Sequence, residues 1–291
     1  MRLSRSDSDT YRTHRCSNPH ALDDYGCEIE RQRDAWRRKP ALRTLYGHWY
    51  RQCCEALSKM GPTLEIGSGS GNFKSCYPGL IATDVVQGTG ADLVADAMTL
   101  PLREEVVGNI IAFDVIHHLQ RPLRFLRQAI VALKPRGRLV ICEPAVSLWS
   151  RVVYGLFHHE PLDLKWPLFE LDGRPLGFDP GHFFSNQAIG EILFWRARAQ
   201  TVSELGPCRL VQARKFGFLL YPLSGGFSNR CLLPTRGLRT IMKLEDWVTK
   251  PVAGWLTGMR MLVVLEKTSP ALPAVSGSLP HAEERENNQI M

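Results

Sequence analysis

A glycine-rich segment directly after an apolar run is the feature that constrains this chain most. Residues 63–66 have the composition of a buried strand, and Gly67, Gly69 and Gly71 follow at alternate positions. Glycines allow positive φ angles and let a ligand approach the backbone closely. The predicted short helix at 71–76 starts with N–H groups that favour a polar or negative ligand group. The segment therefore predicts a ligand-binding α/β unit.

Short apolar runs and helical stretches alternate along the rest of the chain. We predict strands at 63–66, within 79–85 with its end at Asp84, at 92–95, 106–113 and 138–142, within 210–221, and at 261–266. We predict helices at 122–133, 186–199 and 238–255. Such alternation implies a mostly parallel sheet covered by helices on both faces. The predicted fold is a Rossmann-like α/β fold with a seven-stranded sheet.

Composition shifts divide the chain into further parts. We predict a flexible leader at 1–23, an N-terminal helical cap at 24–60, one domain at 61–267 and a disordered tail at 268–291. The stretch 145–185 interrupts the domain after the fifth strand and is rich in aromatic residues, prolines and glycines. Because it follows the C-terminal end of a strand, we interpret it as a lid over the substrate.

The overall composition is that of a globular protein. Hydrophobic residues make up 44% of the 291 residues and charged residues 22%, which suffices for a substantial core. No apolar run of about 18 residues or signal-peptide pattern is present, so we predict no transmembrane segment. The eight cysteines are irregularly spaced, which favours reduced thiols in a cytoplasmic protein.

The formal net charge of +7 leaves two interpretations open. Many of the basic residues fall into two groups: Arg31, Arg33, Arg37, Arg38, Lys39 and Arg43, and Arg196, Arg198, Arg214 and Lys215. They could form a solvated basic face, or they could contact an anionic partner such as a phosphorylated carrier or a membrane surface. No nucleic-acid-binding motif accompanies the charge, so we expect no specific nucleic-acid partner.

Two ligand classes compete for the glycine loop. Dinucleotide sites prefer Gly-x-Gly-x-x-Gly, but Asn72 stands where the third glycine would be. Glu65, two positions before Gly67, suits a cationic ligand because a carboxylate attracts a sulfonium or amino group. The residues therefore favour S-adenosylmethionine over a nicotinamide dinucleotide.

The glycine loop at 65–71 is followed by four further motifs, at Asp84, 96–97, 114–118 and 133–137. Together they resemble the class I S-adenosylmethionine-dependent methyltransferases, closely from residue 63 to 144. The resemblance implies S-adenosylmethionine as the cofactor, with Asp84 on the ribose hydroxyls and the 96–97 pair beside the adenine. It implies these cofactor-binding residues: Glu65, Gly67, Ser68, Gly69, Gly71, Asp84, Asp96, Ala97 and Asp114.

Candidate catalytic residues come from two places. His117 and His118 follow the fourth strand directly, and histidine titrates near neutral pH. His159 and Glu160 lie in the aromatic insertion and could contact the acceptor. Each pair could instead have a purely structural role: the 117–118 pair in packing, and the 159–160 pair in the lid. No metal is expected, because no second group of His or Cys supports a zinc geometry.

The sequence predicts a methyltransferase for a small-molecule, sugar or lipid-linked acceptor, with O-methylation favoured. No Asn-Pro-Pro-Tyr or Asp-Pro-Pro-Tyr follows the fourth strand, which disfavours methylation of amide or exocyclic nitrogen. Two alternatives stay open: a nicotinamide-dependent oxidoreductase on a Rossmann sheet, and a catalytically inactive methyltransferase-like protein that binds a partner.

Overall fold

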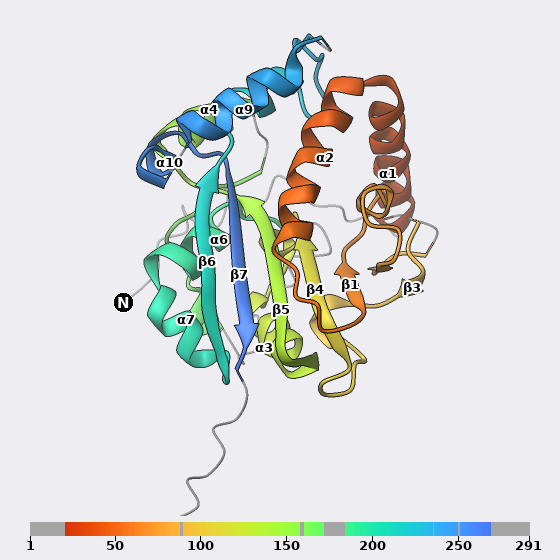
Figure 1. Cartoon of the computed structure of the whole chain (residues 1–291), viewed down its shortest axis with the longest axis vertical. Helices are drawn as coiled ribbons and strands as arrows, with labels where there is room; N and C mark the ends of the chain where they lie inside the picture. The colour runs from red at the N-terminus through yellow and green to blue at the C-terminus, as the bar shows by residue number, and fades with distance from the viewer. Residues whose placement is uncertain are drawn as a thin grey trace, which may run out of the picture.

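The computed structural model describes residues 21–87, 90–157, 160–171, 184–234, 236–249 and 251–268. Its sheet has seven strands in the order β3-β2-β1-β4-β5-β7-β6 (Figure 1). The strands are β1 (Thr63–Ile66), β2 (Ile81–Asp84), β3 (Leu93–Val94), β4 (Val107–Phe113), β5 (Leu133–Pro144), β6 (Cys208–Phe216) and β7 (Arg260–Lys267). The first five pair in parallel, whereas β7 runs antiparallel to both β5 and β6. The predicted mostly parallel, seven-stranded sheet is confirmed.

Helices cover both faces of this sheet (Figure 1). They are α1 (Ala21–Arg38), α2 (Pro40–Glu55), α3 (Pro122–Ala132), α4 (Leu148–Phe157), α5 (Leu168–Leu171), α6 (Ile189–Glu191), α7 (Arg198–Glu204), α8 (Leu220–Ser224), α9 (Leu238–Val248) and α10 (Pro251–Thr257). Short turns add η2 (Phe73–Ser75), η3 (Ala97–Thr99), η4 (Ile116–His118) and the π-helical η5 (Ile192–Arg196). Helices α2, α8 and α9 pack on one face, and α3, α6 and η5 pack on the other.

Side-chain alternation along the central strands creates the two cores. In β4, Ile110 and Ala112 join the core under α3, whereas Ile111 and Phe113 join the core under α2. Successive side chains of a strand point to opposite faces, so a strand buried on both sides is apolar throughout. This explains why β4 reads as a continuous apolar run.

The N-terminal helices are shaped by Pro40. Proline fixes φ and lacks the N–H that a helix interior needs, so it suits the first turn of a helix. Accordingly α1 ends at Arg38 and α2 starts at Pro40. Buried Leu42, Leu45 and Trp49 then attach α2 to the sheet.

Several predicted elements differ from the structure. The fifth strand, predicted at 138–142, is longer and runs from Leu133 to Pro144, and the short helix predicted at 71–76 is a single 3₁₀ turn, η2. The predicted helix 238–255 is divided into α9 and α10, because Pro251 cannot continue a helix and instead starts the next one. The predicted helix 186–199 is interrupted by the π-helical η5. The strand predicted within 210–221 begins slightly before this range, at Cys208, and ends at Phe216, because Gly217 takes a positive φ of 72°.

The described residues include only some of the predicted parts of the chain. The insertion 145–185 contributes α4 and α5, while residues 158–159 and 172–183 lie outside the described residues. Most of the leader and nearly all of the tail also lie outside them. Within the described ranges, no helix has both the length and the apolar character to cross a membrane.

Gly108 provides a test of how β4 is packed against the preceding loop. A Cβ at this position would lie 2.6 Å from the backbone N of Gly61 and 2.6 Å from the backbone carbon of Met60. Backbone cannot yield as a flexible side chain does, so we expect Gly108→Ala to lower the free energy of unfolding by about 1–3 kcal/mol. Denaturant titration would measure the loss. Gly79→Ala is the control, since nothing lies within 4 Å of its added Cβ; equal stability of the two variants would contradict the packing argument.

Candidate active site at the carboxyl ends of the strands

Parallel strands bring the predicted cofactor residues to one edge of the sheet. Glu65 lies in β1, Asp84 ends β2, and Asp114 follows β4. Parallel pairing of β1 with β2 and β4 places the carboxyl ends of these strands side by side (Figure 1). Open α/β sheets bind ligands outside this edge. The acidic residues predicted from the motifs therefore lie at the same edge. We call the region around Glu65, Asp84 and Asp114 at this edge the mouth.

The glycine loop has the backbone that its sequence predicts. Gly67, Gly69 and Gly71 have φ angles of 65°, 52° and 75°, which L side chains rarely adopt. A Cβ on Gly67 would also lie 2.7 Å from Cγ2 of Val115. Substitution of Gly67 would thus collide with the protein itself before it filled any ligand space. The three glycines therefore form a tightly turned backbone cradle.

Asp84 is part of this cradle. Its side chain is buried, and its Oδ2 accepts a hydrogen bond of 2.8 Å from the backbone N–H of Gly69. Its Oδ1 accepts a second, of 3.1 Å, from the N–H of Val86. The carboxylate is therefore fixed beside the loop before any ligand arrives.

The second acidic position lies next along the edge. Asp96 is exposed, caps η3 and accepts a hydrogen bond of 2.7 Å from the N–H of Met98. Ala97 is buried directly after it. The backbone of Ala95 donates to the carbonyl of Asp84 at 2.9 Å, which ties this turn to the end of β2. Asp84 and Asp96 thus lie on the same side of the molecule.

Two buried polar atoms beside the loop lack partners among the described residues. They are Oε2 of Glu65 and Oγ of Ser68. Burial, and then the nearby Asp84, raise the pKa of Glu65 to about 8. A buried polar atom without a hydrogen bond is costly, so it is typically satisfied by a ligand or water. These atoms fit a ligand that carries positive charge and hydrogen-bond donors, as S-adenosylmethionine does.

Glu143 organises the opposite part of the mouth. It lies near the end of β5, and its Oε1 accepts hydrogen bonds of 2.7 Å from the N–H groups of both Val115 and Ile116. Its Oε2 lies 2.5 Å from Nδ1 of His117. Burial opposes its charge, but His117 and the two N–H groups hold the pKa of Glu143 below its usual range. Glu143 is therefore an ionised carboxylate.

The two predicted histidines carry different charges. Burial disfavours the charged form of His117, but Glu143 and then Glu160 outweigh it and raise its pKa to about 9. His118 lies beside it, with ring centroids 4.0 Å apart. Desolvation by the surrounding protein, and then the positive charge of His117, lower the pKa of His118. At neutral pH, His117 is an imidazolium and His118 is neutral.

His118 presents one ring nitrogen as an acceptor. Its Nδ1 lies 3.2 Å from the carbonyl oxygen of Phe184, which can only accept, so Nδ1 carries the proton. The remaining nitrogen, Nε2, then has a lone pair. His118 itself is exposed to solvent, unlike the buried His117.

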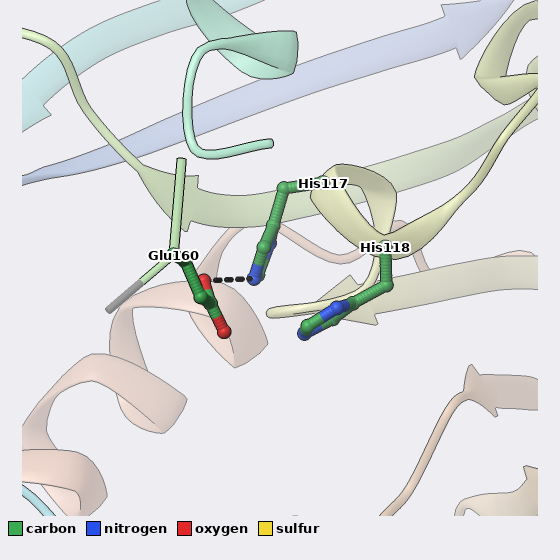
Figure 2. Close-up of side chains that lie close together, drawn as sticks. All are labelled: His117, His118 and Glu160. Carbon is green, nitrogen blue, oxygen red and sulfur yellow. Dashed lines mark ion pairs between the residues drawn. The ribbon is translucent and has the colours of Figure 1, made fainter. Parts of the chain in front are cut away.

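Glu160 reaches the same cluster from the insertion. Its Oε2 lies 3.7 Å from Nε2 of His117, and Figure 2 shows its carboxylate facing both imidazole rings. The side-chain amide of Gln187 also donates to Glu160. The structure therefore brings together three of the four predicted catalytic residues. The fourth, His159, lies outside the described residues.

Arg260 is a site residue that the sequence analysis missed. It starts β7, is buried, and its Nη1 lies 2.7 Å from Oδ1 of Asp114. Its guanidinium also stacks on Trp49 and Phe113, 4.9 and 4.8 Å from the ring centroids. No motif marks it, because the antiparallel pairing of β7 with β5 alone brings it to this edge.

Metal-ligating atoms also gather here. Those of His117, His118 and Glu160 lie within 4.8 Å of one another, as do those of Asp114, His117 and Glu143. Metal binding requires a deprotonated imidazole, whereas Glu143 and Glu160 favour the imidazolium of His117. The geometry thus favours an ion-paired histidine, and the absence of a metal stays a prediction.

Comparisons with known proteins agree with this geometry. Residues 37–197 match a family model described as a methyltransferase domain. A search of curated protein sequences found no match.

Among solved structures, the chain is similar to a chain from the complex between the Haloferax volcanii Trm112 methyltransferase activator and the proposed methyltransferase. They share 14% identity with a TM-score of 0.50, over 86% of this chain and 98% of that chain. A methyltransferase from Archaeoglobus fulgidus shares 15% identity with a TM-score of 0.46, over 77% of this chain and 94% of that one. At such identities, the structural likeness describes the fold alone.

The family model covers more than half of the chain, and it includes the glycine loop, Asp84 and the histidine pair. The alternative of a nicotinamide-dependent oxidoreductase is thereby set aside. The protein belongs to the methyltransferase-domain family, within the class I S-adenosylmethionine-dependent methyltransferases, and S-adenosylmethionine is its cofactor.

Proposed function

We propose that the residues at this edge bind S-adenosylmethionine in the following way. The cradle of Gly67, Ser68, Gly69 and Gly71 receives the amino acid part, and Asp84 accepts hydrogen bonds from the ribose hydroxyls. A charged acceptor makes stronger hydrogen bonds than a neutral one, which suits Asp84 to this role. Asp96 and Ala97 flank the adenine, and Asp114 closes the mouth beside the sulfur.

Glu65 supplies negative charge where the ligand is positive. Its pKa of about 8 keeps it largely protonated while the site is free. A cationic ligand nearby favours the carboxylate form. Ligand binding and ionisation of Glu65 are therefore coupled.

The chemistry that we propose is transfer of the methyl group to a hydroxyl oxygen of a small-molecule, sugar or lipid-linked acceptor. S-adenosylmethionine supplies the methyl group on a positively charged sulfur, so its transfer forms a C–O bond, breaks the C–S bond and leaves a neutral thioether. The hydroxyl proton passes to Nε2 of His118. General-base help of this kind typically contributes about 10²–10⁴-fold to a rate.

The observation that carries this proposal is the split between the two histidines. His118 is neutral, exposed and oriented by the carbonyl of Phe184, as a base must be. His117 is charged and held by Glu143 and Glu160, so it positions its neighbours rather than accepting a proton. Glu160, which reaches the cluster from the insertion, orients the acceptor hydroxyl.

A cytoplasmic location completes the proposal. The cysteines of the described residues are free thiols, as expected in a reducing compartment.

Isotopic transfer tests the reaction class. Protein incubated with methyl-¹³C S-adenosylmethionine and fractionated cell extract is expected to yield a low-molecular-weight or lipid product with a methoxy carbon signal in NMR. Label found only in protein or nucleic acid, or only on carbon or nitrogen, would contradict O-methylation of such an acceptor.

Asp84 tests the cofactor assignment. Because Asp84→Asn removes the charge but keeps an acceptor for the N–H of Gly69, we expect affinity for S-adenosylhomocysteine to fall by about 10- to 100-fold, the scale of about 1.5–3 kcal/mol for a hydrogen bond to a charged group. Calorimetry measures it. Asp246→Asn is the control, since Asp246 pairs with His48 instead. Unchanged affinity in Asp84→Asn would remove Asp84 from the ribose site.

Glu65 predicts a pH dependence of binding. Its pKa of about 8 lies above the ordinary value for Glu, so below pH 8 a proton must leave when Glu65 ionises beside the ammonium group that S-adenosylmethionine and S-adenosylhomocysteine share. We therefore expect affinity for S-adenosylhomocysteine to rise with pH by up to about tenfold per unit between about pH 6 and 8, and then to level off. Calorimetry in buffers of different ionisation enthalpy measures the released proton. In Glu65→Gln this dependence should vanish, whereas in the exposed control Glu104→Gln it should persist.

His118 tests the catalytic base. His118→Ala is expected to lower kcat by about 10²–10⁴-fold while cofactor affinity stays unchanged. The lowered pKa keeps the base neutral, so the wild type should remain active at about pH 6, where an ordinary histidine is half protonated. His48→Ala removes a histidine outside the mouth and is the control. If kcat were retained in His118→Ala, His118 would not be the base.

A further inference from the structure

Nine of the 19 exposed large apolar side chains of the described residues belong to three helices beyond the carboxyl ends of the strands. Figure 1 shows α4, α9 and α10 together at this end of the molecule. Their exposed apolar residues are Leu148, Val152 and Leu156 in α4, Ile241, Leu244, Trp247 and Val248 in α9, and Trp255 and Leu256 in α10. We call these residues the apolar face. Large exposed apolar patches mark sites of contact with proteins or membranes.

Helix α9 is apolar on two sides. One side buries Leu238 and Met242 in the core. Ile241, Leu244 and Val248 recur at three- and four-residue spacing and point outward, with Leu244 58% exposed. A helix that only covers a core has polar residues on its outer side. The outward side of α9 therefore has a contact of its own to make.

The charges that border this face are basic. Arg236, Arg239 and Lys243 are exposed at the start of α9 and along it. The acids of the helix are engaged elsewhere: Glu245 accepts from the N–H groups of Leu219 and Leu220, and Asp246 pairs with His48. The border thus presents positive charge outward, which complements an anionic surface.

Helix α4 connects the apolar face to the active site. Leu148, Val152 and Leu156 are spaced four residues apart on its outer side, and Leu156 is 70% exposed. On an adjacent side, Arg151, Tyr154 and Gly155 line an open cavity of about 310 Å³ together with Glu160 and Leu162. The cavity therefore lies between Glu160, which approaches His117, and the residues of α4 next to the apolar face.

We propose that the apolar face docks onto an anionic lipid bilayer and that the acceptor is the polar headgroup of a lipid or lipid-linked molecule, which enters the cavity beside α4. The choice of acceptor rests on the proposed function; the docking does not. Amphipathic helices with Trp and Leu on the inner side and Lys or Arg at the border lie in bilayer interfaces. A second copy of the chain is disfavoured, because a two-fold contact would bring the basic borders together.

Vesicle flotation tests the docking directly. The purified full-length chain is expected to float with vesicles of phosphatidylcholine and phosphatidylglycerol, and more weakly with phosphatidylcholine alone. Leu244→Asp/Trp255→Asp should weaken binding by about tenfold or more, because two charges enter the apolar face. Val131→Asp/Val211→Asp introduces the same charges at exposed apolar positions elsewhere and should bind as the wild type does.

Charge reversal separates the basic border from the apolar face. Arg239→Glu/Lys243→Glu should weaken binding to the anionic vesicles by about tenfold or more and reduce its salt dependence, while hardly changing binding to phosphatidylcholine. Circular dichroism of each variant confirms that it is folded.

Three outcomes would overturn the proposal. The first is that the wild type does not float with the vesicles, and the second is that Leu244→Asp/Trp255→Asp floats as well as the wild type. The third is a dimer in light scattering that Leu244→Asp/Trp255→Asp dissociates, because that result would assign the apolar face to self-association. S-adenosylhomocysteine binding, measured in each variant, should stay unchanged. A variant that no longer floats but still binds S-adenosylhomocysteine has lost docking alone. If the wild type did not bind S-adenosylhomocysteine, the proposed function would be contradicted, and the docking proposal would still be decided by flotation.

Discussion

The contact on which the site depends is the buried carboxylate of Glu143. It joins the end of β5 to the turn after β4, because it accepts from two consecutive backbone N–H groups and from His117. Charged hydrogen bonds of this kind are strong inside a protein, and an unpaired partner would be costly. This one side chain therefore sets the position of η4 and with it the directions of both histidine rings.

The mouth is also balanced in charge. The imidazolium of His117 faces Glu143 and Glu160, and the guanidinium of Arg260 faces Asp114. Each buried positive charge thus has a carboxylate, which offsets the cost of removing it from water. Oε2 of the buried Glu65, by contrast, has no hydrogen-bond partner among the described residues. On the proposed assignment, the positively charged cofactor lies beside this carboxyl group.

The parts that could be predicted are those fixed by local sequence. Turn residues delimit short apolar strands, so the sheet and the edge that carries Gly67, Asp84 and Asp96 followed from the order of motifs. The role of Arg260 could not be predicted, since it depends on antiparallel pairing between strands far apart in the chain. The approach of Glu160 to His117 likewise depends on how the insertion folds back. Long-range contacts of this type leave no periodic signal in a sequence.

The bond from Gly69 to Asp84 has a consequence for turnover. A carboxylate already anchored by the loop cannot relax into solvent when the ligand leaves, so its affinity for a ribose is the same before and after the reaction. S-adenosylhomocysteine keeps that ribose and loses only the charge on sulfur. On the proposed assignment, the spent cofactor competes with fresh donor for the same rigid anchor, and the working rate becomes sensitive to how quickly the cell clears it.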